Sequence, residues 1–245
     1  MTNHPERTSI SPGDPREWLA AATVDAAVFE LRPDYRALLL TADGPRGGES
    51  DAVSEIIRTD AEYTARRQLA GQPPEQLPHP AAWREAYRAF GAKPQHTRTS
   101  VEALLRRLEP GGLPRIDRIT DVYNAVSIAH VLPIGGEDRA AYAGPPRLVR
   151  AEGSEPFDTT AGGEPVLEHP EPGEVVWRDD AGVTCRRWNW RQTTRTRLTT
   201  GTTRAVFVLD ALGALPDDRL AEAGDALATA LAAGSPHATV RSRVI

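Results

Sequence analysis

The stretch ITDVYNAVSIAHVL followed by PIGGED, residues 119–138, marks the point where the chain changes from helices to strands. Up to residue 132, apolar residues recur at helical spacing, and Asp121 lies in the first turn of the expected helix. From Pro133 onward, short apolar runs alternate with glycine and proline, which is typical of strands and turns. Early strands, central helices and later strands predict one α+β domain and not a series of βαβ units.

Upstream of this stretch, the sequence predicts a short helix, two strands and three longer helices. The short helix should begin at Asp14-Pro15 and turn Trp18 inward, and a tight turn should join strands at 25–32 and 34–40. The longer helices are expected at 50–71, 81–91 and 100–112. The last of them has the clearest pattern, with Ser100 as its N-cap.

Downstream of it, the pattern is mainly one of strands. We expect strands at 147–151, 164–170, 173–182, 183–188 and 205–212. A helix over roughly 216–233 and a last strand at 237–245 complete the chain. Residues 1–15 carry three prolines and no periodic pattern, so we expect a disordered tail followed by a single domain over 16–245.

Composition excludes several classes of protein. The 245 residues carry a net charge of -5 and one cysteine, so neither an internal disulfide nor a four-cysteine metal site is possible. Neither a run of apolar residues long enough to cross a bilayer nor a secretory signal is present, so we expect a cytoplasmic protein that does not contact a membrane.

The familiar catalytic motifs are also missing. GxSxG, HExxH, GxGxxG and the phosphate-binding loop do not occur, and the six histidines lack metal-ligand spacing. We therefore predict no metal and no cofactor, and we assign no catalytic residue. In VTCRR, Cys185 alternates inward with Val183, which predicts a buried thiol.

The segment CRRWNWRQTTRTRLTTGTT, residues 185–203, combines five arginines and two tryptophans with no acidic residue. In one interpretation it is a hairpin whose arginines pair with acidic residues of the same domain. In the other, guanidinium groups and indoles contact phosphates and unpaired bases of RNA. A reader of duplex DNA would more often carry basic residues on a recognition helix, so DNA is not expected.

A second basic cluster occupies residues 84–118. If both basic stretches contact RNA, phosphate contacts are expected from four arginines: Arg98, Arg106, Arg107 and Arg191.

Three motifs in succession resemble a known family. FGAKPQHTRTSVEALLRR (90–107), LPRIDRITDVYNAVSIAHVLPIGGED (113–138) and EPGEVVWRDDAGVTCRRWNWRQTTRT (171–196) are similar to the freestanding B3/B4 tRNA-binding domain proteins. These in turn resemble the B3/B4 module of the bacterial phenylalanyl-tRNA synthetase β subunit. The resemblance covers residues 80–212 and, more loosely, 16–235.

The resemblance implies a β-sandwich-like core of mixed sheets flanked by helices, and tRNA or aminoacyl-tRNA as a partner. In the synthetase, this module hydrolyses tyrosine mischarged onto the phenylalanine tRNA. The corresponding pocket would be lined by nine residues: Tyr123, Asn124, Ser127, Gly135, Gly136, Arg187, Trp188, Asn189 and Trp190.

Two departures from the family pattern fall in this pocket. The synthetase loop typically reads Pro-Leu-His-Ala-Phe-Asp, whereas residues 133–138 read PIGGED and lack the histidine. RRWNWRQTT (186–194) replaces the glycine-rich turn with its pocket glutamate. The resemblance therefore predicts a remodelled pocket.

Several interpretations of the remodelled pocket stay open. Trp188 and Trp190, two apart on an extended chain, would clamp a planar group, or else both would fill the core. The chain would bind tRNA and hydrolyse a mischarged ester in trans, or bind a small amino-acid-like ligand without tRNA, or act as a non-catalytic partner protein.

Overall fold

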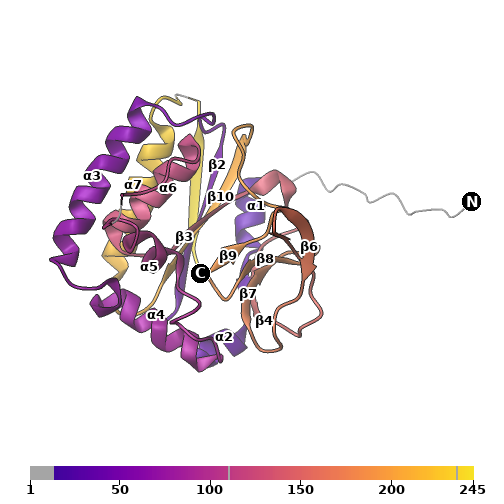
Figure 1. Cartoon of the computed structure of the whole chain (residues 1–245). Coiled ribbons are helices and arrows are strands. Elements are labelled where there is room, and N and C mark those ends of the chain that lie inside the picture. The colour runs from indigo at the N-terminus through magenta and orange to yellow at the C-terminus, as the bar shows by residue number, and fades with distance from the viewer. Residues whose placement is uncertain (1–13, 110, 236) are drawn as a thin grey trace, which may run out of the picture.

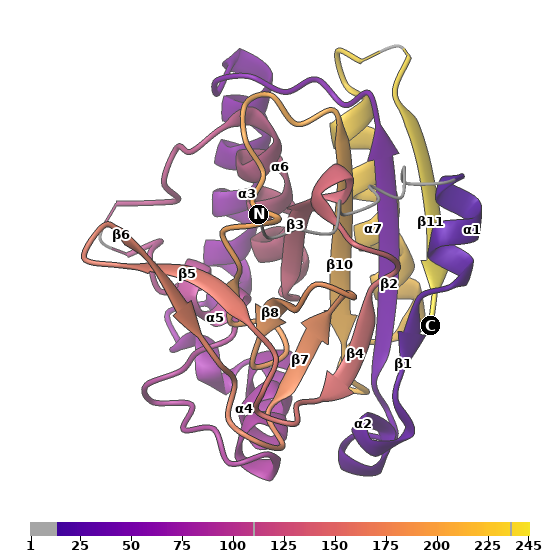
Figure 2. The ribbon, with the colours of Figure 1, turned by 90° about the vertical axis from the view of Figure 1, so that its right-hand side faces the viewer.

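The computed structural model describes residues 14–109, 111–235 and 237–245. Two sheets and a helical layer make up the fold (Figures 1 and 2). The first sheet is antiparallel and has the strand order β11 (Thr239–Val244), β2 (Arg36–Asp43), β10 (Arg204–Ala211), β3 (Ile134–Asp138).

The second sheet has the order β1 (Thr23–Val24), β4 (Arg147–Arg150), β7 (Val175–Arg178), β8 (Val183–Arg186), β9 (Arg191–Gln192). Its β1–β4 pair is parallel and the other pairs are antiparallel. A separate hairpin consists of β5 (Phe157–Ala161) and β6 (Glu164–Glu168).

The helices are α1 (Pro15–Ala20), α2 (Ala26–Leu31), α3 (Ala52–Leu69), α4 (Pro78–Ala89), α5 (Ser100–Leu105), α6 (Arg118–His130) and α7 (Asp217–Ala232). Short 3-10 turns occur at Pro74–Gln76 and Arg139–Ala141. Helices α6 and α7 cover one face of the first sheet, with α3 outside α6 (Figure 1).

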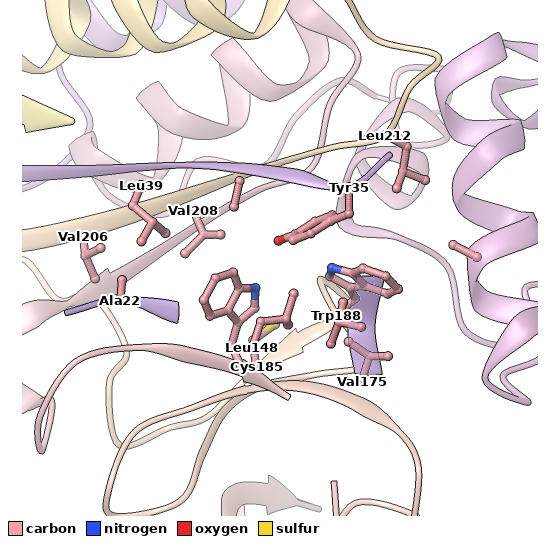
Figure 3. Close-up of a cluster of buried hydrophobic side chains, with 14 of the residues drawn as sticks. Ala22, Tyr35, Leu39, Leu148, Val175, Cys185, Trp188, Val206, Val208 and Leu212 are labelled. Atoms are coloured by element: carbon pink, nitrogen blue, oxygen red, sulfur yellow. The ribbon is translucent and has the colours of Figure 1, made fainter. Parts of the chain in front are cut away.

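The first sheet is apolar on both faces because its strands alternate. On β10, Phe207 and Leu209 pack with the helices, whereas Val206 and Val208 pack toward the second sheet. Figure 3 shows the second of these cores, with Leu39 and Val208 from the first sheet above Leu148 and Cys185 from the second. The expected single α+β domain with a mixed β-sandwich core and flanking helices is confirmed.

Helix α6 is fixed at both ends by its own sequence. The Asp117 side chain accepts a hydrogen bond from the Thr120 backbone N–H at 2.9 Å, and Val131 ends the helix in the left-handed conformation. Beyond it the chain enters β3, so Gly135 and Gly136 lie in a strand, and the loop expected there is wrong. Pairing with β10 outweighs the low strand propensity of two glycines.

Two other sequence predictions are also wrong. Residues 26–31 form α2 and not a strand, because Asp25 caps the first turn and Val28 packs into the core. The helix predicted over 100–112 ends at Leu105 and continues as turns, and its N-cap is Thr99 instead of Ser100.

Two predictions concern the N-terminus and membrane contact. Of the expected tail at 1–15, residues 1–13 lie outside the described part of the chain, and Pro15 begins α1. Among the described residues, none of the helices is long and apolar enough to cross a bilayer.

Candidate ligand pocket

A cavity of about 210 Å³ lies between the two sheets, at the β3 edge of the first one. The first sheet contributes residues of β3 and β10, the second contributes residues of β7 to β9, and helices α5 and α6 close the side. Its buried lining includes Trp177, Trp188 and Val208, whereas Arg107 and Ile116 are exposed. The pocket thus has a desolvated interior and a solvated mouth.

The strand register defines the wall formed by the first sheet. Glu137 pairs with Val206, and Gly135 pairs with Val208. Asp210 lies two residues further along β10, on the same face as Val206 and Val208. A strip from Glu137 past Gly135 and Val208 to Asp210 therefore faces the second sheet.

Asp210 is at one end of this strip and is 2% exposed. Its carboxylate accepts hydrogen bonds from the Tyr35 hydroxyl at 2.6 Å and from the Asn189 amide at 3.3 Å. Burial raises the pKa of Asp210 to about 7, because the charged form loses its hydration. The Tyr35 hydroxyl points into this region beside Trp188 (Figure 3).

Glu137 is at the other end of the strip and is 3% exposed. It accepts hydrogen bonds from the Tyr142 hydroxyl at 2.5 Å, the Thr196 hydroxyl at 2.8 Å and the Gln192 amide at 3.3 Å. Burial raises the pKa of this carboxyl as well. The hydrogen-bond donors around both carboxyls are uncharged.

Because Gly135 has no side chain, the Gln192 amide can approach the pocket wall formed by β3. A Cβ at Gly135 would lie 2.9 Å from the Gln192 amide nitrogen, which donates to the Gly136 carbonyl at 3.0 Å. The histidine-free sequence of residues 133–138 therefore leaves room that the Gln192 side chain occupies.

The structure brings together six of the nine residues expected at the pocket. Tyr123, Asn124, Gly135, Trp188, Asn189 and Trp190 line it.

The other three expected pocket residues have structural roles outside the lining. The Ser127 hydroxyl donates to the Leu132 carbonyl at the end of α6, and Gly136 faces the Tyr123 ring. Arg187 lies 3.6 Å from Glu174 and donates to Thr97, on a neighbouring surface hollow.

The segment that carries the two tryptophans is not extended, so the backbone geometry assumed for the clamp is wrong, although both side chains line the pocket. Arg187 and Trp188 adopt left-handed backbone conformations, with φ of 48° and 68°, and the segment turns where an extended chain was expected. Trp188 is fully buried among aromatic rings, 5.1 Å from Tyr35 and 5.2 Å from Trp83 between ring centroids. Trp190 is half-buried, and its ring contacts the guanidinium of Arg191.

Four of the five arginines of the basic segment pair with carboxylates of the same domain, and no carboxylate of the described residues lies within 4.0 Å of the fifth, Arg197. Arg186 contacts Glu174 at 2.8 Å and Glu168 at 2.9 Å, and Arg195 contacts Asp179 at 2.8 Å. The interpretation as an internally paired hairpin accounts for these arginines.

Three of the four arginines expected at tRNA phosphates are paired as well. Arg191 lies 2.8 Å from Glu168, and Arg106 and Arg98 lie 3.1 and 3.6 Å from Glu102. The charges of these three arginines are therefore compensated within the domain. Arg107 is exposed at the pocket mouth, and no carboxylate of the described residues lies within 4.0 Å of it.

Cys185 lines the pocket but is buried, as predicted, and burial raises its pKa well above the ordinary value. The side chain is therefore a neutral thiol and not a nucleophilic thiolate. In the described part of the chain, no three His, Cys, Asp or Glu side chains gather as metal ligands.

Sequence reasoning missed the polar residues of the pocket wall, Glu137, Asp210 and Gln192. An acidic residue inside the apolar run AVFVLDAL was the available signal for Asp210, because a buried strand seldom carries a charge without a function. Glu137 and Gln192 carry no such signal, since strand pairing alone places them together.

The fold and the pocket together define a two-sheet α+β domain with a cavity between its sheets. Residues 82–215 match the family model of the B3/4 domain, and the chain belongs to that family. A solved structure that is similar is an N-terminal fragment of the phenylalanyl-tRNA synthetase β subunit from Pyrococcus horikoshii, with 14% identity and a TM-score of 0.46. The match covers 90% of this chain and 50% of that one, so the chain spans about half of its length. No curated protein sequence matches the chain significantly.

Proposed function

We propose that the chain binds an amino-acid-like ligand, either free or esterified to tRNA, in the pocket between the two sheets. The observation that carries the proposal is the composition of this pocket. It combines an apolar, aromatic interior with two buried carboxyl groups and an exposed arginine at the mouth. Small-ligand sites are typically apolar cavities with a few polar groups that fix orientation.

The charges along the pocket suit the two ends of an amino acid. The Glu137 carboxyl is available to an ammonium group inside, and Arg107 to a carboxylate or a phosphate at the mouth. An aminoacyl ester of tRNA has the same ammonium group, and its ribose and phosphates would extend toward solvent.

The second form of the proposed ligand is an amino acid esterified to tRNA, which has the same ammonium group. Membership in the B3/4 family and the unpaired, exposed Arg107 favour it. The internal pairing of Arg98, Arg106 and Arg191 opposes it, because each would have to exchange a carboxylate for a phosphate.

Hydrolysis of a mischarged ester in trans would be a further step of the tRNA-linked mode. The buried thiol of Cys185 is not suited to nucleophilic attack, so a water molecule positioned by the pocket would have to attack the ester. Glu137 is the group that we expect to accept its proton, because it is buried, lines the pocket and has a raised pKa.

The test offers the intact chain free amino acids, their methyl esters, and tRNA with and without an aminoacyl group, at physiological salt. Binding is followed by calorimetry and ester loss by acid precipitation of the labelled aminoacyl-tRNA. Gly135→Leu should abolish binding by filling the pocket, whereas Gly201→Leu, at an exposed glycine where a Cβ would meet only the Thr199 hydroxyl at 3.8 Å, should not. Binding of none of the probes, or equal binding by Gly135→Leu, would contradict the proposal.

The same titrations separate the two sources of the ligand. Binding of free amino acids alone supports the small-ligand mode, and tighter binding of aminoacylated than of deacylated tRNA supports the tRNA-linked mode. Ester loss that stops in Glu137→Gln supports hydrolysis in trans.

A further inference from the structure

Outside the pocket wall, the buried carboxylates of the described residues fall into two groups. Most of them have an arginine counterion, and these include Glu62, Glu102, Glu155, Glu174 and Asp179. Asp117 and Asp121 instead accept hydrogen bonds from backbone N–H groups around the start of α6.

The two carboxylates on the pocket wall are different. Within the described residues, Glu137 and Asp210 have neither an arginine within 4.0 Å nor a backbone N–H donor to the carboxylate. A buried charge without a counterion is unfavourable, and the same fold supplies counterions elsewhere. Arg107 and Arg191 also line the pocket, but neither lies within 4.0 Å of these two carboxylates, so the pocket wall is where a counterion is missing.

The Asp210 end of the pocket also has unused hydrogen-bonding capacity. Trp177 and Trp188, 2% and 0% exposed, line the pocket, with the indole N–H of Trp177 toward Asp210 and that of Trp188 toward Tyr35, but neither makes a well-formed hydrogen bond among the described residues. An apolar group bound here would leave these donors weakly bonded and the Asp210 carboxylate without a counterion. A polar ligand group, with any water that accompanies it, would use them.

The ionisable side chains at the Asp210 end of the pocket determine which charge a bound polar group should carry. Tyr35 and Cys185 also lie here, but burial raises the pKa of both well above the ordinary value, so both stay neutral. Asp210 is thus the one group here, among the described residues, that can carry a charge at neutral pH. Its electrostatic complement is a cation.

The strip of the wall between the two carboxyls gives the shape of the ligand. Asp210 and Glu137 are separated by four residues along the strand direction, which is roughly 14 Å between their Cα atoms. Only Val208 and Gly135 project between them on this face. An aliphatic chain with a charged nitrogen near each end fits such a strip.

On the basis of the proposed function, we infer that the ligand is an amino acid with a positively charged side chain, of the lysine type. Its side-chain nitrogen contacts Asp210, its aliphatic part lies over Val208 and against the Gln192 side chain that covers Gly135, and its α-ammonium contacts Glu137. The carboxylate or ester end then lies toward Arg107 at the mouth.

The test compares lysine with norleucine, which lacks only the side-chain amine, and with glutamine, which has a neutral polar end. Each is offered to the intact chain as the free amino acid and as the methyl ester, at pH 8. We expect lysine to bind about 30-fold more tightly than norleucine in one or both forms, the preference of a buried charge pair. Asp210→Asn should remove this preference and leave norleucine binding within about threefold.

Glu137→Gln should weaken lysine and norleucine alike, because both have the α-ammonium. The control Asp218→Asn, in the first turn of α7 and away from the pocket, should change nothing. Equal or tighter binding of norleucine or glutamine by the native chain would overturn the inference and leave the proposed function standing. Binding of none of the probes would contradict the proposed function itself.

Discussion

The two faces of the first sheet carry out different tasks. Toward α6 and α7, β10 presents Phe207 and Leu209 to a closed apolar core. Toward the second sheet, the same strand presents Val208 and Asp210 to a cavity. Both faces bury an apolar core, but the sandwich face also buries two carboxyl groups that have no arginine counterion among the described residues, and these lower stability unless a bound cation compensates them.

The largest effect should come from the helix face. Phe207→Ala removes a fully buried ring and should lower the free energy of unfolding by about 3–5 kcal/mol. Val208→Ala, on the opposite face, should cost less than about 2 kcal/mol because Val208 already borders the cavity. Urea unfolding of both variants measures the difference, and equal losses would contradict the division of tasks.

Asp210→Asn should increase stability at alkaline pH. The folded-state pKa of about 7 lies above the ordinary value of 3.8, so ionisation of Asp210 opposes folding as pH rises between these values. Asparagine avoids this cost, which approaches about 4 kcal/mol above pH 7. The variant should therefore match the native chain near pH 4 and exceed it at pH 8 in urea unfolding. A variant that is less stable at pH 8 would show that the carboxylate stabilises the fold.

Gly135 and Gly136 are adjacent in β3 and face opposite sides of the first sheet, so substitutions at these two positions test the two faces separately. A Cβ at Gly136 would lie 2.8 Å from the Tyr123 ring, so Gly136→Ala should lower stability by about 1–3 kcal/mol and leave binding intact. A Cβ at Gly135 would meet only the flexible end of Gln192. Gly135→Ala should therefore change stability by less than about 1 kcal/mol but weaken ligand binding, measured by calorimetry.

The smallest effect on stability should come from the pocket mouth. Arg107→Ala should change the free energy of unfolding by less than about 0.5 kcal/mol, because Arg107 is exposed. If tRNA is the source of the ligand, this variant should also reduce the salt dependence of tRNA binding by about one ion. A salt series on native and variant protein tests this, and an unchanged slope would remove Arg107 from the tRNA surface.

The sequence predicted the layers of this fold better than its pocket. Helical spacing identified α3, α6 and α7, and runs of β-branched residues identified β7, β8 and β10, because burial of one face imposes these patterns. It failed at 25–32, where a capping Asp25 overrides strand-like residues, and at β3, where pairing with β10 overrides two glycines.

The pocket was only partly predictable for a physical reason. The resemblance located Asn124, Gly135 and Asn189 in the pocket. Glu137 and Asp210 both line the same cavity because of the register between β3 and β10. The arginines were misjudged because their counterions, such as Glu168 for Arg191, are distant in sequence. Neither register nor ion pairs can be inferred from local composition.

Proton release on ligand binding tests most directly whether the buried carboxylate of Asp210 receives a positive charge. At pH 7 the free pocket holds Asp210 about half protonated, and a bound cation would lower its pKa and expel the proton. Calorimetry of lysine or its methyl ester in two buffers of different ionisation enthalpy measures the exchange. The account predicts proton release at pH 7 by the native chain and a smaller release by Asp210→Asn, because only Glu137 then loses a proton to the bound cation. Binding without proton release, or with proton uptake, would contradict it.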